Sequence, residues 1–295
     1  MEPSTAIEYS CSPFHEQPVS DQNGGVGDWE RLRSDLAEMD SVMVAFSGGV
    51  DSSFLAWVAH DVLGDRAHAV TAVSPSLAKA EREDCASLAA EWGLRWSEVH
   101  TDEMEHAAYV ANDGDRCYWC KDALMDAVAP LAEATSSTVA LGVNTDDLGD
   151  HRPGQRAAAE RGAVFPLVDA EFSKADVREW SQRLGLRTWD KPAAPCLASR
   201  IPYGTPVTMG ALASVGDAEA ALRRLGFAEL RVRHYGDLAR IEVPEERLAD
   251  VVAQRAAVVE AVRQAGYRYA TLDLDGFRSG NLNDVLDIGP SSSRP

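Results

Sequence analysis

Val42-Met-Val-Ala-Phe-Ser47-Gly-Gly-Val-Asp-Ser-Ser53 is the stretch that decides the fold. It begins with a short apolar run, passes through two adjacent glycines, and leads into residues 54–62, where apolar side chains recur at helical spacing. This order predicts a strand, a tight loop and a helix. Glycine allows the backbone to come close to an anion, and the free N–H groups at the start of the helix would bind it.

The same alternation of apolar runs and helical stretches continues after this loop. We predict, in order, a strand at 68–73, a helix over 77–92, a strand at 95–100, a helix near 121–134 and a strand at 138–143. Such alternation is typical of an α/β fold with a doubly wound parallel sheet, covered by helices on both faces. Ligands bind beyond the carboxyl ends of the strands in these sheets, so the loop at Ser47 would lie at the binding edge.

The pattern changes after residue 204. A helix over 209–225, strands at 230–234 and 239–243, a helix over 245–266 and a strand at 269–274 form a predicted α-β-β-α-β unit. We therefore expect a larger α/β domain at 28–204 that contains the glycine loop, and a smaller α+β domain at 205–280, for substrate binding or oligomerisation. Residues 1–27 and 281–295 lack an apolar period and are predicted to be disordered tails.

The composition is that of a globular but strongly acidic protein. Of 295 residues, 47 are acidic and 28 are basic, which gives a formal net charge of −19. Such a chain repels a polyanion, so we expect a small-molecule substrate and no nucleic-acid partner. No stretch reaches the roughly 18 consecutive apolar residues of a membrane helix, and residues 1–27 do not resemble a signal peptide. We therefore expect a cytoplasmic protein without a membrane partner.

The glycine loop resembles the pyrophosphatase loop of N-type ATP pyrophosphatases. Those enzymes release pyrophosphate from ATP and leave AMP on the substrate, so the resemblance implies ATP as cofactor and a role for Asp51 in organising Mg²⁺. A GxxxxGK(S/T) motif is missing from the sequence, which argues against γ-phosphate chemistry. A bare Ser-Gly-Gly would be only a capped turn. The predicted nucleotide-binding residues here are Ser47, Gly48, Gly49, Val50, Asp51, Ser52 and Ser53.

Two later segments supply further candidates for the nucleotide site. Asn144 and Asp147 follow the strand predicted at 138–143, which places them on the same edge of the sheet. Lys174 starts a predicted helix and resembles a lysine that follows the same region in related synthetases, where it could neutralise phosphate. The alternatives are that Asn144 and Asp147 only cap a turn, and that Lys174 is an exposed lysine in the first turn of its helix.

Three of the five cysteines are candidates for chemistry. Arg116-Cys117-Tyr-Trp-Cys120-Lys121 carries two thiols at CxxC spacing, flanked by positive charges that stabilise thiolates. Cys196 lies in the proline-rich segment 191–200, which is expected to be an exposed loop at the domain junction. Three thiols suit a 4Fe-4S cluster with one open iron, and zinc or a redox disulfide are the alternatives. Cys11 and Cys85 are interpreted as ordinary residues.

Four segments follow one another along the chain: Ser47-Gly-Gly-Val-Asp-Ser52, the stretch 142–154, Pro195-Cys-Leu-Ala-Ser-Arg-Ile-Pro-Tyr-Gly204 and Arg231-Val-Arg-His-Tyr-Gly236. Together they resemble the LarE family, whose members are ATP-dependent sulfur transferases that build the nickel-pincer nucleotide cofactor of lactate racemase. The resemblance implies that the carboxylates of pyridinium-3,5-biscarboxylic acid mononucleotide are adenylylated and then converted to thiocarboxylates.

The resemblance implies two possible sources of sulfur. In members with one active-site cysteine, the residue matching Cys196 attacks the acyl-adenylate and loses its own sulfur, which leaves dehydroalanine. Members with three cysteines are expected to hold a 4Fe-4S cluster whose open iron carries a sulfide for delivery. Because Cys117 and Cys120 accompany Cys196, we favour the cluster route.

The resemblance also implies a group of residues around the substrate, namely Ser199, Arg200, Glu219, Glu242 and Asp250. The predicted catalytic residues are Ser199, Arg200, Cys196 and Asp51. Arg231 and Arg233 alternate along a predicted strand, so both would point to one face and could grip the substrate phosphate. Trp119 is a candidate for stacking on the pyridinium, with a core position as the alternative. Glu219 and Asp250 could equally be solvated helix residues.

Other functions share parts of this pattern. A tRNA thiolase combines a PP-loop with cysteines, but it would need a basic surface for RNA. An amide-forming synthetase of the GMP or NAD synthetase type shares the loop and needs no thiols. A non-enzymatic nucleotide or iron–sulfur binding module is the third alternative. The resemblance further implies a symmetric homo-oligomer, either a trimer or a hexamer.

Overall fold

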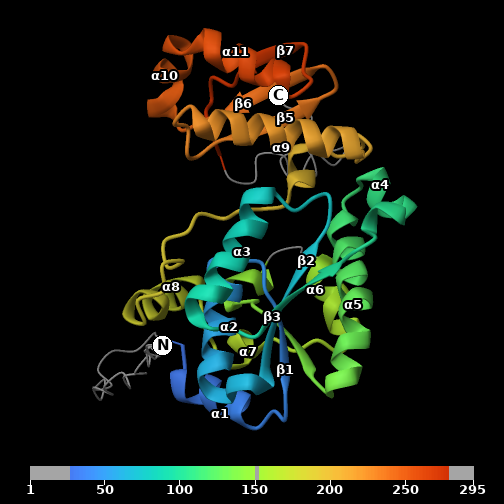
Figure 1. Ribbon diagram of the computed structural model, residues 1–295, viewed down its shortest axis with the longest axis vertical. Helices are drawn as coiled ribbons and strands as arrows, with labels where there is room; N and C mark the ends of the chain where they lie inside the picture. Colours follow the sequence, from blue (N-terminus) through green and yellow to red (C-terminus); the bar gives the residue numbers. More distant parts are fainter. Residues whose placement is uncertain (1–26, 150–152, 279–295) are drawn as a thin grey trace, which may run out of the picture.

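The computed structural model describes residues 27–149 and 153–278. Its larger sheet has four parallel strands in the order β3-β2-β1-β4. Their bounds are β1 Val42–Ala45, β2 Ala67–Val73, β3 Trp96–His100 and β4 Thr138–Leu141. The predicted α/β class with a parallel sheet is confirmed (Figure 1). Apart from Gly27, the tails predicted at 1–27 and 281–295 lie outside the described residues.

Helices cover both faces of this sheet because successive β1 side chains point to opposite sides. Val42 and Val44 pack into one core and Met43 into another. The first core is closed by α1 Trp29–Ala37, α2 Val50–Leu63, α3 Lys79–Trp92, α7 Pro166–Asp169 and α8 Lys174–Arg183. The second is closed by α5 Arg116–Thr135 and α6 Pro153–Glu160, which lie on the opposite side of the sheet in Figure 1.

The strand order places the ligand-binding edge. The chain runs from β1 outward to β2 and β3, and then returns to the other side of β1 to form β4. The direction of winding therefore reverses between β1 and β4, and in open parallel sheets ligands bind beyond the carboxyl ends of such a pair. The loop at Ser47 follows β1, and Asn144 follows β4, so both leave the sheet at this point.

A second, three-stranded sheet forms the upper body in Figure 1. Strands β5 Arg231–Tyr235 and β6 Leu238–Glu242 are antiparallel, and β7 Tyr269–Leu272 is parallel to β6. Helices α9 Met209–Arg224, α10 Leu248–Ala253 and α11 Arg255–Gln264 complete this part, which has a core of its own. The domain boundary placed after residue 204 stays a prediction.

The structure differs from the predicted elements in two places. The single helix expected over 245–266 is divided into η5 Glu245–Arg247, α10 and α11, with a break at Gln254 that the apolar spacing does not mark. Helix α5 begins at Arg116 rather than near 121, so the CxxC lies within helix and not in a turn. The apolar period that predicted this helix starts one turn after its first residue. The remaining short helices are η1 Gly64–Arg66, η2 Glu103–Glu105, α4 Ala107–Ala111, η3 Thr145–Gly149 and η4 Leu197–Arg200.

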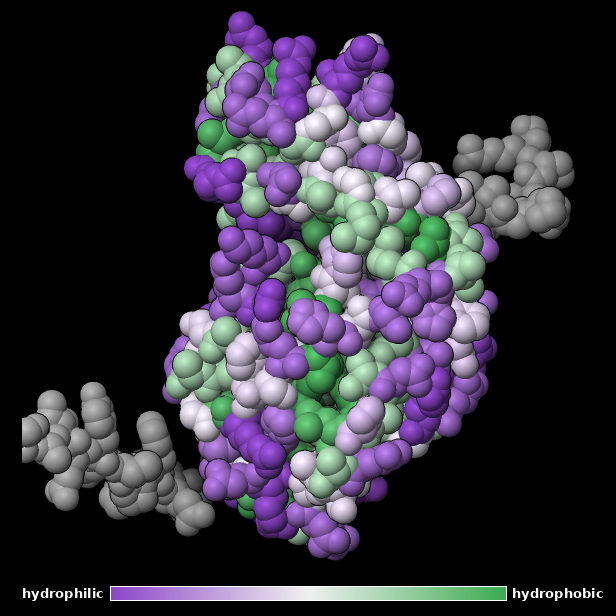
Figure 2. Space-filling view, turned by 45° about the vertical axis from the view of Figure 1, so that its right-hand side comes forward, coloured by the Kyte–Doolittle hydropathy of each residue, from purple (hydrophilic) through white to green (hydrophobic). Residues whose placement is uncertain are grey.

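The face shown in Figure 2 is largely polar, with several separate apolar patches along its middle. Among the described residues, the structure contains no helix whose length and hydropathy would allow it to cross a membrane.

Candidate active site

The loop after β1 presents backbone N–H groups at the start of α2. Gly48 adopts a φ of +69°, a left-handed conformation that glycine enters without strain. Ser52 Oγ accepts from the Ser47 N–H at 3.2 Å and donates to the Gly49 carbonyl at 3.1 Å, which braces the loop from inside. No side chain caps α2 at Gly49. The first N–H groups of α2 are therefore not satisfied by a side-chain cap, as an anion-binding helix end requires.

The seven predicted loop residues do not share one environment. Ser47 is exposed and its Oγ lies 3.0 Å from Ser52 Oγ. Val50 and Ser53 are buried, and Val50 contributes to the first core. Ser53 is fully buried, so its hydroxyl is not presented at the surface of the loop. The backbone of the loop, rather than all of its side chains, forms the accessible part of this site.

Asp51 is the centre of a polar group contributed by three segments. Its Oδ1 accepts from Asn144 Nδ2 at 3.1 Å, and its Oδ2 accepts from Lys174 Nζ at 2.5 Å. Asp147 Oδ2 accepts from the Asn144 N–H at 3.2 Å, which holds the turn after β4. The structure thus brings together all three candidates from the later segments. Sequence reasoning missed Asp146, whose Oδ2 accepts from the Lys174 N–H at 3.0 Å.

A glycine allows β4 to approach the phosphate loop this closely. A Cβ atom on Gly142 would lie 2.7 Å from the Ser52 nitrogen and 2.8 Å from the Asp51 carbonyl carbon. Real side chains do not come so near to backbone atoms, so another residue here would push β4 and α2 apart. The position of Asn144 beside Asp51 depends on this contact.

Two of the three candidate cysteines lie in one partly buried cluster. Cys120, on α5, and Cys196, directly before η4, both pack against an apolar group that includes Tyr109 and Leu197. Cys117 is exposed on the same helix, one turn before Cys120. The segments carrying the three thiols therefore meet, although the chain between Cys120 and Cys196 is long.

A buried arginine joins these two segments. Arg116, at the start of α5, is 5% exposed, and its Nη1 donates to Asn112 Oδ1 at 2.6 Å and to the Ala198 carbonyl at 2.9 Å. Burial opposes its charge, but the nearby Cys196 and Cys117 thiols favour it, and the net effect raises the pKa of Arg116. Burial, and secondarily Cys196, raises the pKa of the Cys120 thiol to about 12. At neutral pH the raised pKa keeps Cys120 a thiol, although a fixed positive charge near the cysteines acts in the opposite direction.

The donor set agrees in kind with a 4Fe-4S cluster, because thiolates are the usual ligands of such clusters. Cys120 and Cys196 pack against the same apolar cluster, and Cys117 lies three residues before Cys120 on α5, on the same side of the helix. Within residues 27–149 and 153–278, however, no group of three or more His, Cys, Asp or Glu side chains is arranged to hold a metal ion.

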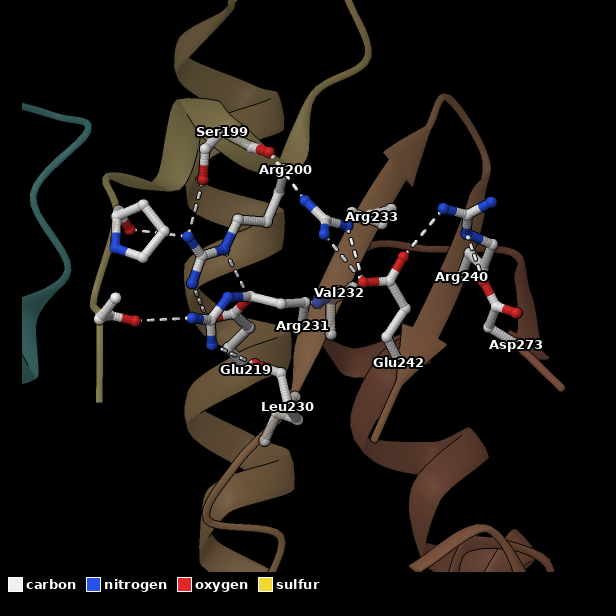
Figure 3. A network of polar contacts seen from close by, with 12 residues as sticks. Ser199, Arg200, Glu219, Leu230, Arg231, Val232, Arg233, Arg240, Glu242 and Asp273 are labelled. Atoms are coloured by element: carbon white, nitrogen blue, oxygen red, sulfur yellow. Dashed lines mark hydrogen bonds and ion pairs between the residues drawn. The ribbon is translucent and has the colours of Figure 1, made fainter. Parts of the chain in front are cut away.

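Arg200 and Glu219 form a buried ion pair next to Cys196 (Figure 3). Arg200 Nε donates to Glu219 Oε1 at 2.8 Å, while Nη1 donates to the carbonyls of Pro195 and Cys196 and to Ser199 Oγ. Burial alone would raise the pKa of Glu219, but hydrogen bonding to Arg200 and the charges of Arg200 and Arg223 lower it. Arg200 therefore fixes the backbone on both sides of the Cys196 peptide.

The two arginines of β5 have different partners (Figure 3). Arg233 donates to Glu242 Oε2 at 2.9 Å and to the Ser199 carbonyl at 2.9 Å. Arg231 donates to the carbonyls of Leu230 and Ala193, each at 2.8 Å. Burial, followed by the charge of Arg200, lowers the pKa of Arg231 to about 10. Its described hydrogen bonds go to neutral carbonyls, so Arg231 retains a charge that an anion could neutralise.

Two predicted residues lie in settings that do not single them out. Asp250 is exposed and pairs with Arg247 at 2.7 Å on η5. Trp119 is partly buried against the cluster that contains Cys120, and its ring stacks on His106 with centroids 6.1 Å apart.

Sequence reasoning also missed Lys191, which contacts the Gly48 carbonyl, and no local motif marks that lysine.

Comparisons with known proteins give one matching family and several relatives. Residues 30–116, from α1 to the start of α5, match the NAD synthase family. An uncharacterised protein of Synechocystis sp. is 49% identical over 261 residues, which cover 87% of this chain and 97% of that protein. Pyridinium-3,5-bisthiocarboxylic acid mononucleotide synthase of Lactiplantibacillus plantarum is 40% identical over 253 residues, covering 85% and 92%. An uncharacterised protein of Methanocaldococcus jannaschii is 24% identical over 253 residues, covering 84% and 96%.

Proposed function

The chain belongs to the family of the pyridinium-3,5-bisthiocarboxylic acid mononucleotide synthases, the LarE family, and we propose that it is an ATP-dependent sulfur transferase acting in nickel-pincer cofactor biosynthesis. Its substrate would be pyridinium-3,5-biscarboxylic acid mononucleotide. The observation that carries this proposal is the 40% identity to such a synthase over 85% of the chain. The loop before α2, which has no side-chain cap, and the partly buried thiols of Cys120 and Cys196 supply groups that the chemistry needs.

The first step would activate a carboxylate. An oxygen of the substrate carboxylate attacks the α-phosphorus of ATP, pyrophosphate leaves, and an acyl-adenylate forms. The N–H groups of the Gly48 loop would bind the departing phosphates, and Lys174 would add positive charge there. Mg²⁺ suits oxygen ligands, and Asp51 would contribute one. Asn144 would hold Asp51 in place, and Asp147 would hold the turn after β4 that carries Asn144.

The second step would replace AMP by sulfur. If Cys196 is the donor, its thiolate attacks the acyl carbon, AMP leaves and a thioester forms. Removal of the Cα proton by a base then breaks the Cβ–S bond, which yields the thiocarboxylate and leaves dehydroalanine in the chain. Arg200 would position this cysteine, since it holds the carbonyls of Pro195 and Cys196.

A 4Fe-4S cluster would be held by Cys117, Cys120 and Cys196, and we propose it as the source of the transferred sulfur. Bound there, it would supply a sulfide from its open iron, so that no cysteine is consumed. The arrangement that supports this is the meeting of the α5 start with the Cys196 segment. Arg116 would offset negative charge at the thiolates.

The substrate phosphate would bind at Arg231. This guanidinium is partly buried and donates to carbonyl oxygens, whereas Arg233 forms an ion pair with Glu242. The Ala193 carbonyl that Arg231 contacts lies three residues before Cys196, so a phosphate here would bring the substrate near that cysteine. Ser199, Glu219 and Glu242 would support this site by holding the arginines.

A homo-oligomer, a trimer or a hexamer, remains part of the proposal. Large apolar side chains are exposed on the part of the chain after residue 204, including Tyr269 at 57% and Val252 at 59%. Light scattering of the purified protein would test it, and a monomer would contradict it.

The test of the proposed function is pyrophosphate release from Mg²⁺–ATP with different acceptors. Release that requires the pyridinium dicarboxylate mononucleotide is the expected result. Release that requires tRNA instead would indicate a thiolase, and release with ammonia and a simple carboxylate would indicate an amide-forming synthetase. Binding of ATP without release under any of these conditions would indicate a non-enzymatic module.

A further inference from the structure

Lys191 connects parts of the molecule that are distant in the sequence. Its Nζ atom donates to the Gly48 carbonyl oxygen at 3.0 Å, to Glu81 Oε2 at 2.8 Å and to Asp84 Oδ2 at 2.7 Å. An ammonium has three N–H groups, so these acceptors use all of them. Burial would lower the pKa of Lys191, but the hydrogen bonds to Asp84 and Glu81 raise it, and the side chain remains charged.

The contact with Gly48 determines which way one peptide of the phosphate loop faces. In a trans peptide, the C=O group and the following N–H point in opposite directions. Because Lys191 holds the Gly48 carbonyl on the side of α3, the Gly49 N–H is turned away from α3. Glycines on both sides of this peptide give its torsions wide freedom, so the contact with the ammonium helps to select one orientation.

Neighbouring atoms already limit the space around this peptide. A Cβ atom on Gly48 would lie 2.9 Å from Cys85 Sγ and 3.7 Å from Lys191 Nζ. The loop therefore packs directly on the side chains of α3 and on the lysine. A substitution at Lys191 would therefore affect the loop backbone directly, because no other residue lies between them.

The same lysine begins the segment that ends at Cys196. Two prolines in this segment fix φ and make it stiff. The carbonyls of Ala193 and Pro195 accept hydrogen bonds, at 2.8 Å and 2.7 Å, from the two arginines described above. The segment is thus attached to the nucleotide loop at one end and to the arginines at the other.

We propose that Lys191 is a positioning residue, which orients the Gly48-Gly49 peptide for the phosphates of ATP and fixes the Cys196 segment to that loop. It acts through the peptide and not as a ligand, since its own donors are occupied by the protein. That the nucleotide is ATP rests on the proposed function, whereas the position of Lys191 rests on its own contacts.

The test is the affinity for Mg²⁺–ATP, measured by calorimetry without a second substrate. Lys191→Met should weaken binding by about tenfold, the scale expected when a charged hydrogen bond is lost. Arg187→Met is the matched control, because Arg187 also pairs with Asp84 but its hydrogen bonds go to α3 and not to the loop. It should bind Mg²⁺–ATP like the wild type.

A second variant separates positioning from folding. Lys191→Met leaves Glu81 without its partner, whereas Asp84 keeps Arg187. Lys191→Met with Glu81→Gln removes the unpaired charge and should regain stability while ATP binding stays weak. Wild-type affinity in either Lys191 variant, or an equal loss in Arg187→Met, would overturn the inference alone. Absence of ATP binding in the wild type would overturn the proposed function as well.

Discussion

The Nη1 atom of Arg116 lies 2.9 Å from the carbonyl oxygen of Ala198, a contact that joins the helix of the CxxC to the segment of Cys196 across 82 residues of chain. The same atom donates to Asn112 at 2.6 Å, and Asn112 Nδ2 in turn donates to the carbonyls of Pro202 and Thr205. Arg116 and Asn112 are both buried. A continuous set of buried hydrogen bonds therefore positions the thiols relative to each other.

Arg116→Met should destabilise the protein. The change leaves Asn112 Oδ1 and the Ala198 carbonyl without their charged donor, and we expect a loss of about 3 kcal/mol in the free energy of unfolding. Urea unfolding followed by circular dichroism would measure it. Arg156→Met, which removes an exposed pair with Glu160 and a contact over the Tyr118 ring, is the control and should change little. Equal stabilities of the two variants would contradict the assigned role of Arg116.

Glu219→Gln should remove a pH-dependent part of the stability. The folded pKa of Glu219 is lowered below its ordinary value of 4.5, so its contribution is complete above 4.5 and is lost as the pH falls through the folded pKa. In the variant, buried Arg200 loses a charged partner, which should cost about 3–5 kcal/mol near neutral pH. The difference from wild type should shrink in acid, as measured by urea unfolding over a pH series. A constant difference would show that Glu219 acts by packing alone.

Gly142→Ala should disturb the nucleotide loop. The new Cβ atom would come within 2.7 Å of the Ser52 nitrogen, so β4 or α2 must move, and we expect weaker Mg²⁺–ATP binding. Stability should fall by about 2 kcal/mol, as for other overpacked sites. Gly210→Ala is the control, because a Cβ atom there meets nothing within 4 Å. Calorimetry with Mg²⁺–ATP would compare the two, and tight binding by Gly142→Ala would contradict the close contact.

Cys117→Ser should abolish iron binding. Protein purified without oxygen should contain about four irons per chain, together with acid-labile sulfide and a broad visible absorption band, since thiolates hold such clusters. The variant should contain little of either. If wild type also lacks iron after reconstitution, Cys196 becomes the sulfur donor, and its loss of sulfur should appear in the mass of the intact protein.

The nucleotide half of the site could largely be predicted from the sequence because its signals are local. The strand, the paired glycines and the helix of residues 42–63 are adjacent in the chain, and the position of Asn144 follows from a parallel sheet. Lys174, at the start of α8, was a candidate only through resemblance to related synthetases. The predicted start of helix α5, near residue 121, is later than its observed start at Arg116, because the first turn of this helix lacks the apolar period. Asp250 was singled out by family resemblance, and nothing in its exposed pairing with Arg247 distinguishes it.

The parts that could not be predicted are contacts between distant segments. Lys191 and Gly48 are separated by 143 residues, and neither residue type nor spacing indicates that they meet. The different partners of Arg231 and Arg233 also depend on the folded structure, since alternation along a strand places both on one face without saying what each contacts. Arg231 meets the segment before Cys196 at Ala193, whereas Arg233 meets β6 at Glu242.

The central claim is that this chain places sulfur on an ATP-activated carboxylate. The measurement that tests it most directly is the mass of the small-molecule product after anaerobic incubation with Mg²⁺–ATP and pyridinium-3,5-biscarboxylic acid mononucleotide. We predict a product in which sulfur has replaced a carboxylate oxygen, formed by wild type and absent with Cys196→Ser. An unchanged substrate despite pyrophosphate release, or a sulfur-containing product from Cys196→Ser at the wild-type level, would contradict the account.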